Sequence, residues 1–192
     1  MRLLRLKVTE AMPGRVLPMI ALSHGPEEAA ARYRALVIHT LRQLRGLPDT
    51  EIELLCEPED AAEAIRFWIL PALAQDWSAQ QESLFVTEGW CIRFSSPATR
   101  PDVIAEGEVL CPWLGARLVH TALLGLERNS HRVLGLSPCG RPYLQASGHS
   151  TPDDVPVQHL PAMSIVHNDN DWLAALDSPL GPALKRAHEE AC

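Results

Sequence analysis

Paired cysteines and long apolar runs are both missing from this sequence of 192 residues. Its five cysteines are an odd set without CxxC spacing, which argues against a disulfide framework and against a zinc knuckle. The N-terminal segment lacks the unbroken apolar stretch of a signal peptide. The longest apolar run, 67–74, is far shorter than the roughly 20 residues that span a bilayer. We therefore expect a cytoplasmic protein without a membrane span.

Positive charge is also scarce. Lys and Arg total 17 against 24 Asp and Glu, so the formal net charge is −7, and no basic stripe marks a nucleic-acid partner. Apolar residues make up 46% and charged residues 21%, which is ordinary globular usage and not that of a disordered chain. No linker divides the sequence, and its length suits one hydrophobic core. We expect a single domain over residues 1–192.

Helical and strand patterns alternate along the chain. Apolar alternation and short apolar runs predict strands at 3–8, 51–57, 92–94, 103–105, 132–136 and near 164–166. Helical spacing of apolar residues predicts helices over 26–45, 61–74, 114–126, 171–176 and 182–190. Segments rich in Pro, Gly and Ser predict loops over 9–24 and 137–157.

This alternation indicates an α/β fold, a three-layer domain around a mostly parallel sheet. In such sheets, ligands bind beyond the carboxyl ends of the strands. Residues that bind a substrate are therefore expected in the loops at 9–24, 57–60, 137–150 and 167–171.

Several segments resemble one family. The loop Glu10–Ile20, with its Pro13-Gly14-Arg15-Val16 core, is similar to a K-x-P-x-P-G-R-V-K-T-R-L loop, and the helix start at Gly25-Pro26-Glu27 follows in the same style. Leu114-Gly115-Ala116-Arg117-Leu118 is similar to L-G-x-R-(M/L), and the segment 135–140 is similar to a strand that ends in G-S-D-C-P. Over residues 1–70 and 108–190, the chain resembles the small bacterial TagF-like, or selenodomain-associated, glycosyltransferases of GT-A type.

The resemblance implies a truncated, Rossmann-like fold of the nucleotide-diphospho-sugar transferases. It also implies a substrate site for a nucleotide or nucleotide-sugar. The anion is expected between Gly14-Arg15 and the helix start at Gly115 and Arg117, with Ser137 at a nearby strand end. For Arg15 and Arg117, a solvated arginine and a surface salt bridge are the alternatives.

The departures from the family concern charge and metal ligands. Two basic positions of the first loop are Leu17 and Met19, the Asp of G-S-D-C-P is Pro138, and a late D-V-D motif is Ile165-Val166-His167. No counterpart of a D-G-G-Y motif is evident between Ser137 and Leu160. Proline and isoleucine offer no ligand to Mg²⁺ or Mn²⁺. We therefore expect no metal site, and a divalent cofactor only if the protein is active.

Two functions follow from these departures. The first is a divergent homologue with weakened or lost catalysis that acts as a binding or interaction module. The alternative is an active glycosyltransferase or nucleotidyltransferase that uses a nucleotide-activated donor, so enzyme status stays open. A thiol hydrolase built on Cys139 is less favoured, because no base is evident and a structural cysteine is expected there. The segment 167–171 is interpreted as a helix cap rather than a metal loop.

Overall fold

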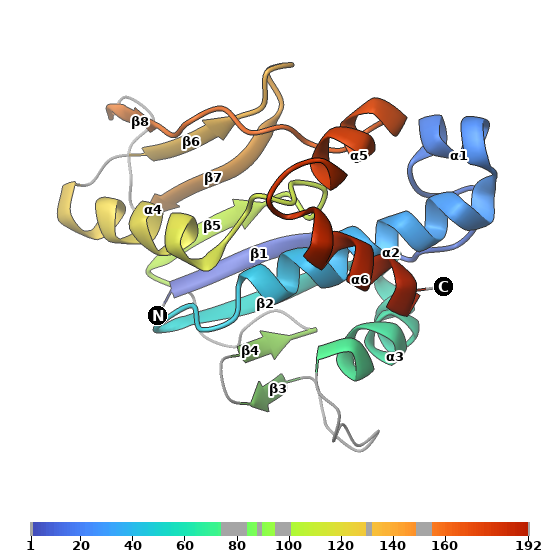
Figure 1. Ribbon diagram of the computed structural model, residues 1–192. Coiled ribbons are helices and arrows are strands. Elements are labelled where there is room, and N and C mark those ends of the chain that lie inside the picture. Colours follow the sequence, from blue (N-terminus) through green and yellow to red (C-terminus); the bar gives the residue numbers. More distant parts are fainter. Residues whose placement is uncertain are drawn as a thin grey trace.

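A mixed eight-stranded sheet forms the centre of the described protein (Figure 1). The computed structural model describes residues 2–73, 84–87, 90–94, 101–129, 132–148 and 155–191. The strands are β1 (Arg2–Thr9), β2 (Thr50–Glu57), β3 (Leu84–Thr87), β4 (Trp90–Arg93), β5 (Val103–Gly107), β6 (Arg132–Leu136), β7 (Pro142–Gly148) and β8 (Val157–His159). Their order across the sheet is β3-β4-β2-β1-β5-β7-β6-β8.

Most of the sheet is parallel. β1 pairs in parallel with β2 and β5, β2 with β4, and β6 with β8, whereas β3 and β7 run antiparallel to their neighbours. The predicted α/β fold class with a mainly parallel sheet is confirmed. The parallel strands therefore end at one shared edge, the right-hand edge in Figure 1.

Six helices accompany the sheet within these ranges. They are α1 (Pro18–His24), α2 (Pro26–Gln43), α3 (Ala62–Leu73), α4 (Ala116–Asn129), α5 (Asp169–Leu176) and α6 (Gly181–Ala191), with a short 3₁₀ turn, η1 (Glu59–Ala61), before α3. α2 begins with Pro26 and two glutamates in its first turn, which suits the positive end of the helix dipole. α6 packs along α2 (Figure 1). In the described part of the chain, no helix is both long and apolar enough to cross a membrane.

Alternation along β1 separates the two faces of the sheet. Leu4, Leu6 and Val8 are fully buried in the core that α2 covers. Arg5 and Lys7 lie on the opposite face, where Arg5 pairs with the buried Glu53 of β2. One face of the central strands is therefore apolar, and the other carries charged side chains.

Two segments predicted as loops are structured. Residues 18–24 form α1, and the segment 137–157 contains β7, which pairs with both β5 and β6. The loop over 137–157 was predicted from its content of Pro, Gly and Ser. Pro142 does not exclude a strand, because it occupies the first position of β7, where proline is tolerated. The prediction of a strand near 164–166 is also wrong. The strand that follows β7 is β8, at Val157–His159.

Candidate functional site

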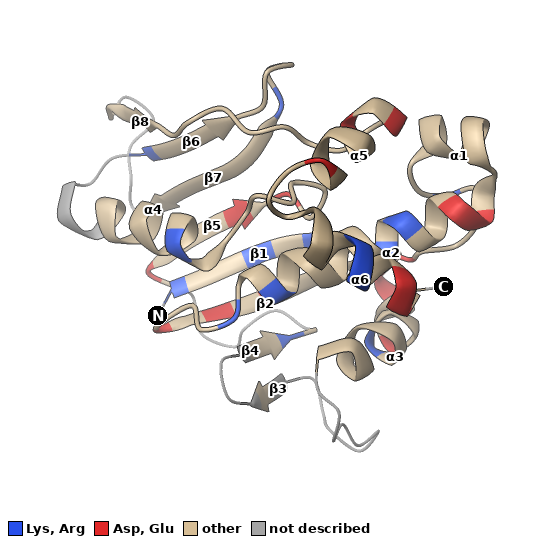
Figure 2. Ribbon diagram, viewed as in Figure 1, with Lys and Arg blue, Asp and Glu red and all other residues tan. Residues whose placement is uncertain are grey.

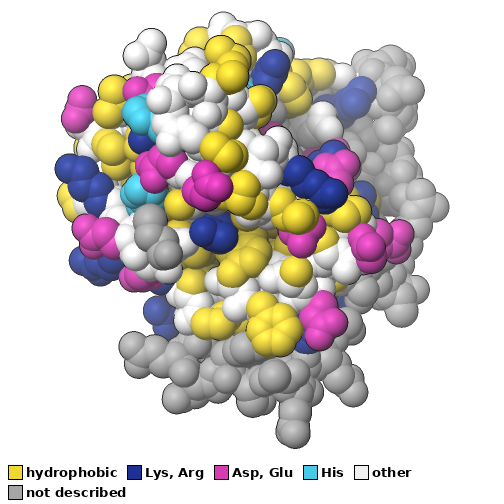
Figure 3. Space-filling model, turned by 90° about the vertical axis from the view of Figure 1, so that its right-hand side faces the viewer, with side chains coloured by type: hydrophobic (Ala, Val, Ile, Leu, Met, Phe, Trp, Pro, Cys, Tyr) yellow, Lys and Arg dark blue, Asp and Glu magenta, His cyan; other side chains and the backbone are white. Residues whose placement is uncertain are grey.

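The order of the strands reverses between β1 and β5. From β1 the chain adds β2 and then β4 on one side, and it returns to place β5 on the other side of β1. Ligands of open α/β sheets bind beyond the carboxyl ends of the strands at such a reversal. The candidate site therefore lies beyond Thr9 and Gly107, at the edge that Figure 3 views face on. Charged and histidine side chains gather there beside a band of apolar ones (Figure 3).

The loop after β1 holds two of the predicted residues. The Glu10 N–H donates to the Glu57 carbonyl at 2.8 Å, which ties the loop to β2, and the Arg15 N–H donates to the Met12 carbonyl at 3.1 Å. Gly14 has φ +84°, and a Cβ added there would meet no atom within 4 Å, so conformation rather than space favours glycine at this position. The Arg15 guanidinium is about half exposed and lies 3.5 Å from the Glu10 carboxylate. Gly14 and Arg15 thus reach the expected edge.

Tyr33 of α2 fixes the end of β1. The Thr9 N–H donates to the Tyr33 hydroxyl at 2.7 Å. Burial raises the pKa of Tyr33 to about 12, so the phenol stays neutral at physiological pH. A strand-end N–H that would otherwise lack a partner is therefore satisfied from a helix.

The turn from β6 into β7 holds Ser137, the third predicted element. The Ser137 N–H donates to the Arg141 carbonyl at 2.7 Å, and the Arg141 N–H donates to Ser137 Oγ at 3.0 Å. Cys139 is exposed in this turn, with its Sγ 3.1 Å from Ser137 Oγ. The hydrogen bond with Ser137 is the main cause that lowers the pKa of the Cys139 thiol. Cys139 therefore lies at the surface of the turn, and its role as a structural cysteine stays a prediction.

Arg141 is a site residue that the sequence analysis missed. Its Nη1 lies 3.3 Å from His167 Nε2, and its exposed guanidinium has no carboxylate partner among the residues that the structure describes. Leu6 pairs with Gly107, and Gly107 with Leu144, so Arg141 stands three residues further along, level with Thr9. Two strand spacings, about 10 Å, separate the backbones of β1 and β7. Only the strand order could have shown this proximity.

The structure does not bring Gly115 and Arg117 to this edge. A Cβ added at Gly115 would lie 3.8 Å from the carbonyl oxygen of Gln43, the last residue of α2. Tyr33, which marks the candidate site, is ten residues earlier on α2, or about 15 Å along the helix axis. The segment 109–115 runs back along α2, since Thr40 Oγ1 donates to the Val109 carbonyl at 3.0 Å. The structure therefore does not place Arg117 beside Arg15, as the predicted anion site requires.

The segment 167–171 is a helix cap, as predicted. The Asn168 side chain accepts from the Asp171 N–H at 3.1 Å, and the Asp171 carboxylate accepts from the N–H groups of Asn168 and His167. Asp169 accepts from Arg32 Nη1 at 2.7 Å and lies 2.9 Å from His24 Nε2. The hydrogen bond from Arg32, above all, holds the pKa of Asp169 below its ordinary value.

The positions that should carry metal ligands do not fit a divalent metal. Pro138 has no donor, Ile165 is buried and apolar, and His167 directs Nε2 towards the Arg141 guanidinium. No group of three or more His, Cys, Asp or Glu side chains that could hold a metal occurs in the described ranges. Glu108, just beyond β5, does offer a carboxylate at the reversal, where its Oε1 accepts from the Leu110 N–H at 3.1 Å. The family pattern did not lead to Glu108, because the strand similar to G-S-D-C-P is β6, two strands away from β5.

The fold matches solved structures across nearly the whole chain. A protein from Desulfovibrio desulfuricans G20, provisionally assigned as a nucleotide-diphospho-sugar transferase, superposes with a TM-score of 0.67 at 15% identity, over 99% of this chain and 96% of that one. The 4-diphosphocytidyl-2C-methyl-D-erythritol synthase of Anaerococcus prevotii DSM 20548 superposes with a TM-score of 0.50 at 12% identity, over 96% and 99%. No protein-family model and no curated protein matches the sequence. The chain therefore has the fold of the nucleotide-diphospho-sugar transferases, at low sequence identity to the members of known structure.

Proposed function

We propose that this protein binds the diphosphate of a nucleotide or nucleotide-sugar at the carboxyl edge of its sheet. The observation that carries the proposal is Arg141, an exposed guanidinium without a carboxylate partner in the described structure, level with the end of β1. A planar guanidinium can pair with a phosphate through two hydrogen bonds. The fold supports the same ligand class, because both solved neighbours are described as enzymes of nucleotide-linked substrates.

Arg15 is the second proposed phosphate contact. Its loop follows β1, and Arg141 directly precedes β7, so both arginines are carried by loops at the same edge of the sheet. We propose that the two side chains hold a diphosphate from opposite sides of β5. Glu10, 3.5 Å from Arg15, competes for the guanidinium only weakly, because exposed ion pairs contribute little. Gly14 and Ser137 shape the two loops that carry these arginines.

We further propose that catalysis is weakened and that the protein acts as a binding or interaction module. Support comes from Pro138, Ile165 and His167, which cannot together hold Mg²⁺ or Mn²⁺. Without a metal, the leaving diphosphate would depend on the two arginines for stabilisation of its charge, a smaller electrostatic contribution.

Glu108 favours a second candidate, an active transferase. Its carboxylate stands just beyond β5, at the reversal of the strand order. A carboxylate there could accept a proton from the hydroxyl group of an acceptor. The two candidates share the nucleotide site and differ in whether chemistry follows binding.

Calorimetric titration with uridine, cytidine and guanosine diphosphates, with and without Mn²⁺, tests the binding proposal. Arg141→Gln should weaken binding about tenfold, the effect of losing one charge-assisted contact, and Arg15→Gln should act similarly. Arg117→Gln is the matched control, since Arg117 lies near the far end of α2. Unchanged affinity in Arg141→Gln would remove this site from consideration.

Release of nucleoside diphosphate from nucleotide-sugars separates the two candidates. If release occurs and Glu108→Gln abolishes it while affinity is kept, the protein is an active transferase. Binding without release supports the module. Micromolar binding that requires Mn²⁺ and survives His167→Ala would contradict the proposed loss of the metal site.

A further inference from the structure

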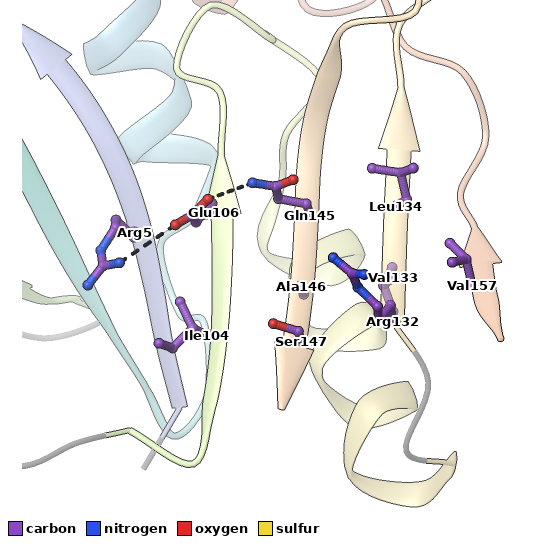
Figure 4. Close-up of a pocket in the computed structure, with 10 residues that line it drawn as sticks. All are labelled: Arg5, Ile104, Glu106, Arg132, Val133, Leu134, Gln145, Ala146, Ser147 and Val157. Atoms are coloured by element: carbon purple, nitrogen blue, oxygen red, sulfur yellow. Dashed lines mark hydrogen bonds and ion pairs between the residues drawn. The ribbon is translucent and has the colours of Figure 1, made fainter. Parts of the chain in front are cut away.

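A pocket of about 420 Å³ lies on the charged face of the sheet (Figure 4). Side chains from β1, β5, β7, β6 and β8 line it, and within the described residues no helix contributes to its wall. Arg5, on its rim, precedes Thr9 by four residues, or about 13 Å along the strand. The pocket is therefore separate from the carboxyl edge, and its volume is typical of small-molecule sites.

A row of hydrogen-bonding groups crosses this pocket. Glu106 accepts from the Gln145 side-chain amide at 2.6 Å, and its other oxygen lies 3.6 Å from Arg5 Nη1 (Figure 4). Arg5 Nε in turn donates to the buried Glu53 at 2.7 Å. The Gln145 carbonyl oxygen and the Ser147 hydroxyl also belong to the lining. The pocket thus offers donors and acceptors side by side on one face of the sheet.

The charges of this row balance. Arg5 contacts the buried Glu53 at 2.7 Å, and its Nη1 lies 3.6 Å from Glu106, so the charges at the centre of the row are already paired with one another. A charged ligand would have to compete with these pairs for Arg5 or Glu106, at a surface where ion pairs contribute little. A neutral ligand with many hydroxyl groups can donate to Glu106 and accept from Arg5 without such competition.

Apolar side chains complete the pocket. Ile104, Leu134 and Val157 lie among the polar groups (Figure 4), and Val157 is exposed on the edge strand β8. A ligand that fits both parts has an apolar C–H surface edged with hydroxyl groups, and a sugar ring has both features.

We propose that this sheet-face pocket binds a neutral saccharide of one or two rings. Glu106 and Gln145 hold its hydroxyl groups, and Ile104 and Leu134 contact its C–H face. The site does not depend on nucleotide binding at the carboxyl edge. A protein with both sites holds a carbohydrate and a nucleotide at the same time, with the carbohydrate away from the strand ends.

Backbone amide NMR tests the proposal, with glucose, galactose, N-acetylglucosamine and maltose as probes and gluconate and glucosamine as charged comparators. At least one neutral sugar should shift the amides of Ile104, Glu106 and Gln145 with saturable, millimolar affinity, and the charged comparators should bind more weakly. Glu106→Ala should weaken binding about tenfold. It leaves Arg5 paired with Glu53, so the sheet should stay folded.

Ser147→Leu is a second variant: it narrows the pocket by volume and removes the Ser147 hydroxyl, but it leaves Arg5, Glu106 and Gln145 in place, and it should also weaken binding. Glu189→Ala, an exposed position on α6, is the control and should bind as the native protein does. No shifts from any neutral sugar up to its solubility limit would overturn the proposal. Tighter binding of gluconate or glucosamine, or equal affinity in Glu106→Ala, would overturn it as well.

Discussion

Arg32 shows how one buried side chain holds several helices over the candidate site. The guanidinium, only 10% exposed, contacts Glu28 at 2.6 Å and Asp169 at 2.7 Å. It also lies 5.3 Å from the centre of the Trp172 ring. Because Asp169 also meets His24 of α1, the cluster links α1, α2 and α5. Acidic and basic residues along α2 and at the start of α5 mark this region in Figure 2.

Asp169→Asn tests this cluster through its dependence on pH. Arg32 lowers the folded-state pKa of Asp169 below the ordinary value of 3.8, so the carboxylate stabilises the fold above about pH 4. That contribution is lost as the pH falls through the folded-state pKa. The variant should therefore be less stable than the native protein at pH 6, and the difference should shrink towards pH 3. Urea denaturation at several pH values measures the effect.

Asp177→Asn, at the exposed end of the same helix, is the control for that series. Asp177 makes no ion pair within the described residues, so its replacement should leave the pH dependence of stability unchanged. A constant difference between Asp169→Asn and the native protein at all pH values would contradict the assigned role of the charge.

At the scale of elements, the β6–β7 hairpin depends on a close contact between the two strands. A Cβ at Gly135 would fall 2.3 Å from Cζ of Tyr143, a fully buried ring. The Tyr143 hydroxyl donates to the Pro161 carbonyl at 2.6 Å, so the ring also anchors the segment after β8. Gly135 therefore leaves the space in which Tyr143 joins the hairpin to the C-terminal part of the chain.

Gly135→Ala should lower the free energy of unfolding by about 1–3 kcal/mol, because an added methyl group overpacks the ring. Gly125→Ala in α4 is the matched control. Its Cβ would meet only the flexible end of Gln158, at 3.0 Å, and alanine favours a helix by about 0.5–1 kcal/mol over glycine. Chemical denaturation should thus give opposite signs for the two variants. Equal effects would show that Tyr143 can move aside.

Local sequence patterns predicted those elements whose periodicity is strong. β1, α2, β2 and α4 follow apolar spacing, and their approximate ranges are confirmed. β7 was missed because it lies in a segment rich in Pro, Gly and Ser and its first residue is Pro142. Of its two partners, β6 precedes it directly in the chain, but β5 is distant in sequence. α1 was missed because Ile20 is its only buried side chain, so it has no apolar stripe. Both elements depend on tertiary contacts that a single sequence does not display.

The candidate site was harder to predict than the elements. Gly14, Arg15 and Ser137 could be expected near strand ends, because short motifs follow strands β1 and β6. Arg141 and Glu108 could not, because their place depends on the order of strands across the sheet. Gly115 was misplaced for the same reason, since a helix start need not lie at the carboxyl edge when the segment before it runs back along α2.

At the scale of the whole molecule, the sheet carries both proposed ligand sites, and its central strand β1 is expected to be its most stable part. The apolar side chains of β1 are fully buried, and β1 is hydrogen-bonded on both sides. β8 is an edge strand with three exposed residues. Local opening should therefore be easiest at β8 and α1 and hardest at β1.

Amide hydrogen exchange should display this order and separate the two sites. Amides of β1 should exchange only through global unfolding, so any ligand at 100 times its Kd should slow them by the equivalent of about 2.7 kcal/mol. Beyond this shared effect, uridine diphosphate should slow the loop 10–17 and the turn 137–141, whereas a bound saccharide should slow β5 and β7 but not the loop. Identical footprints would mean that the two ligands share one site. Exchange in β8 as slow as in β1 would show that the edge of the sheet is not the weak part of the fold.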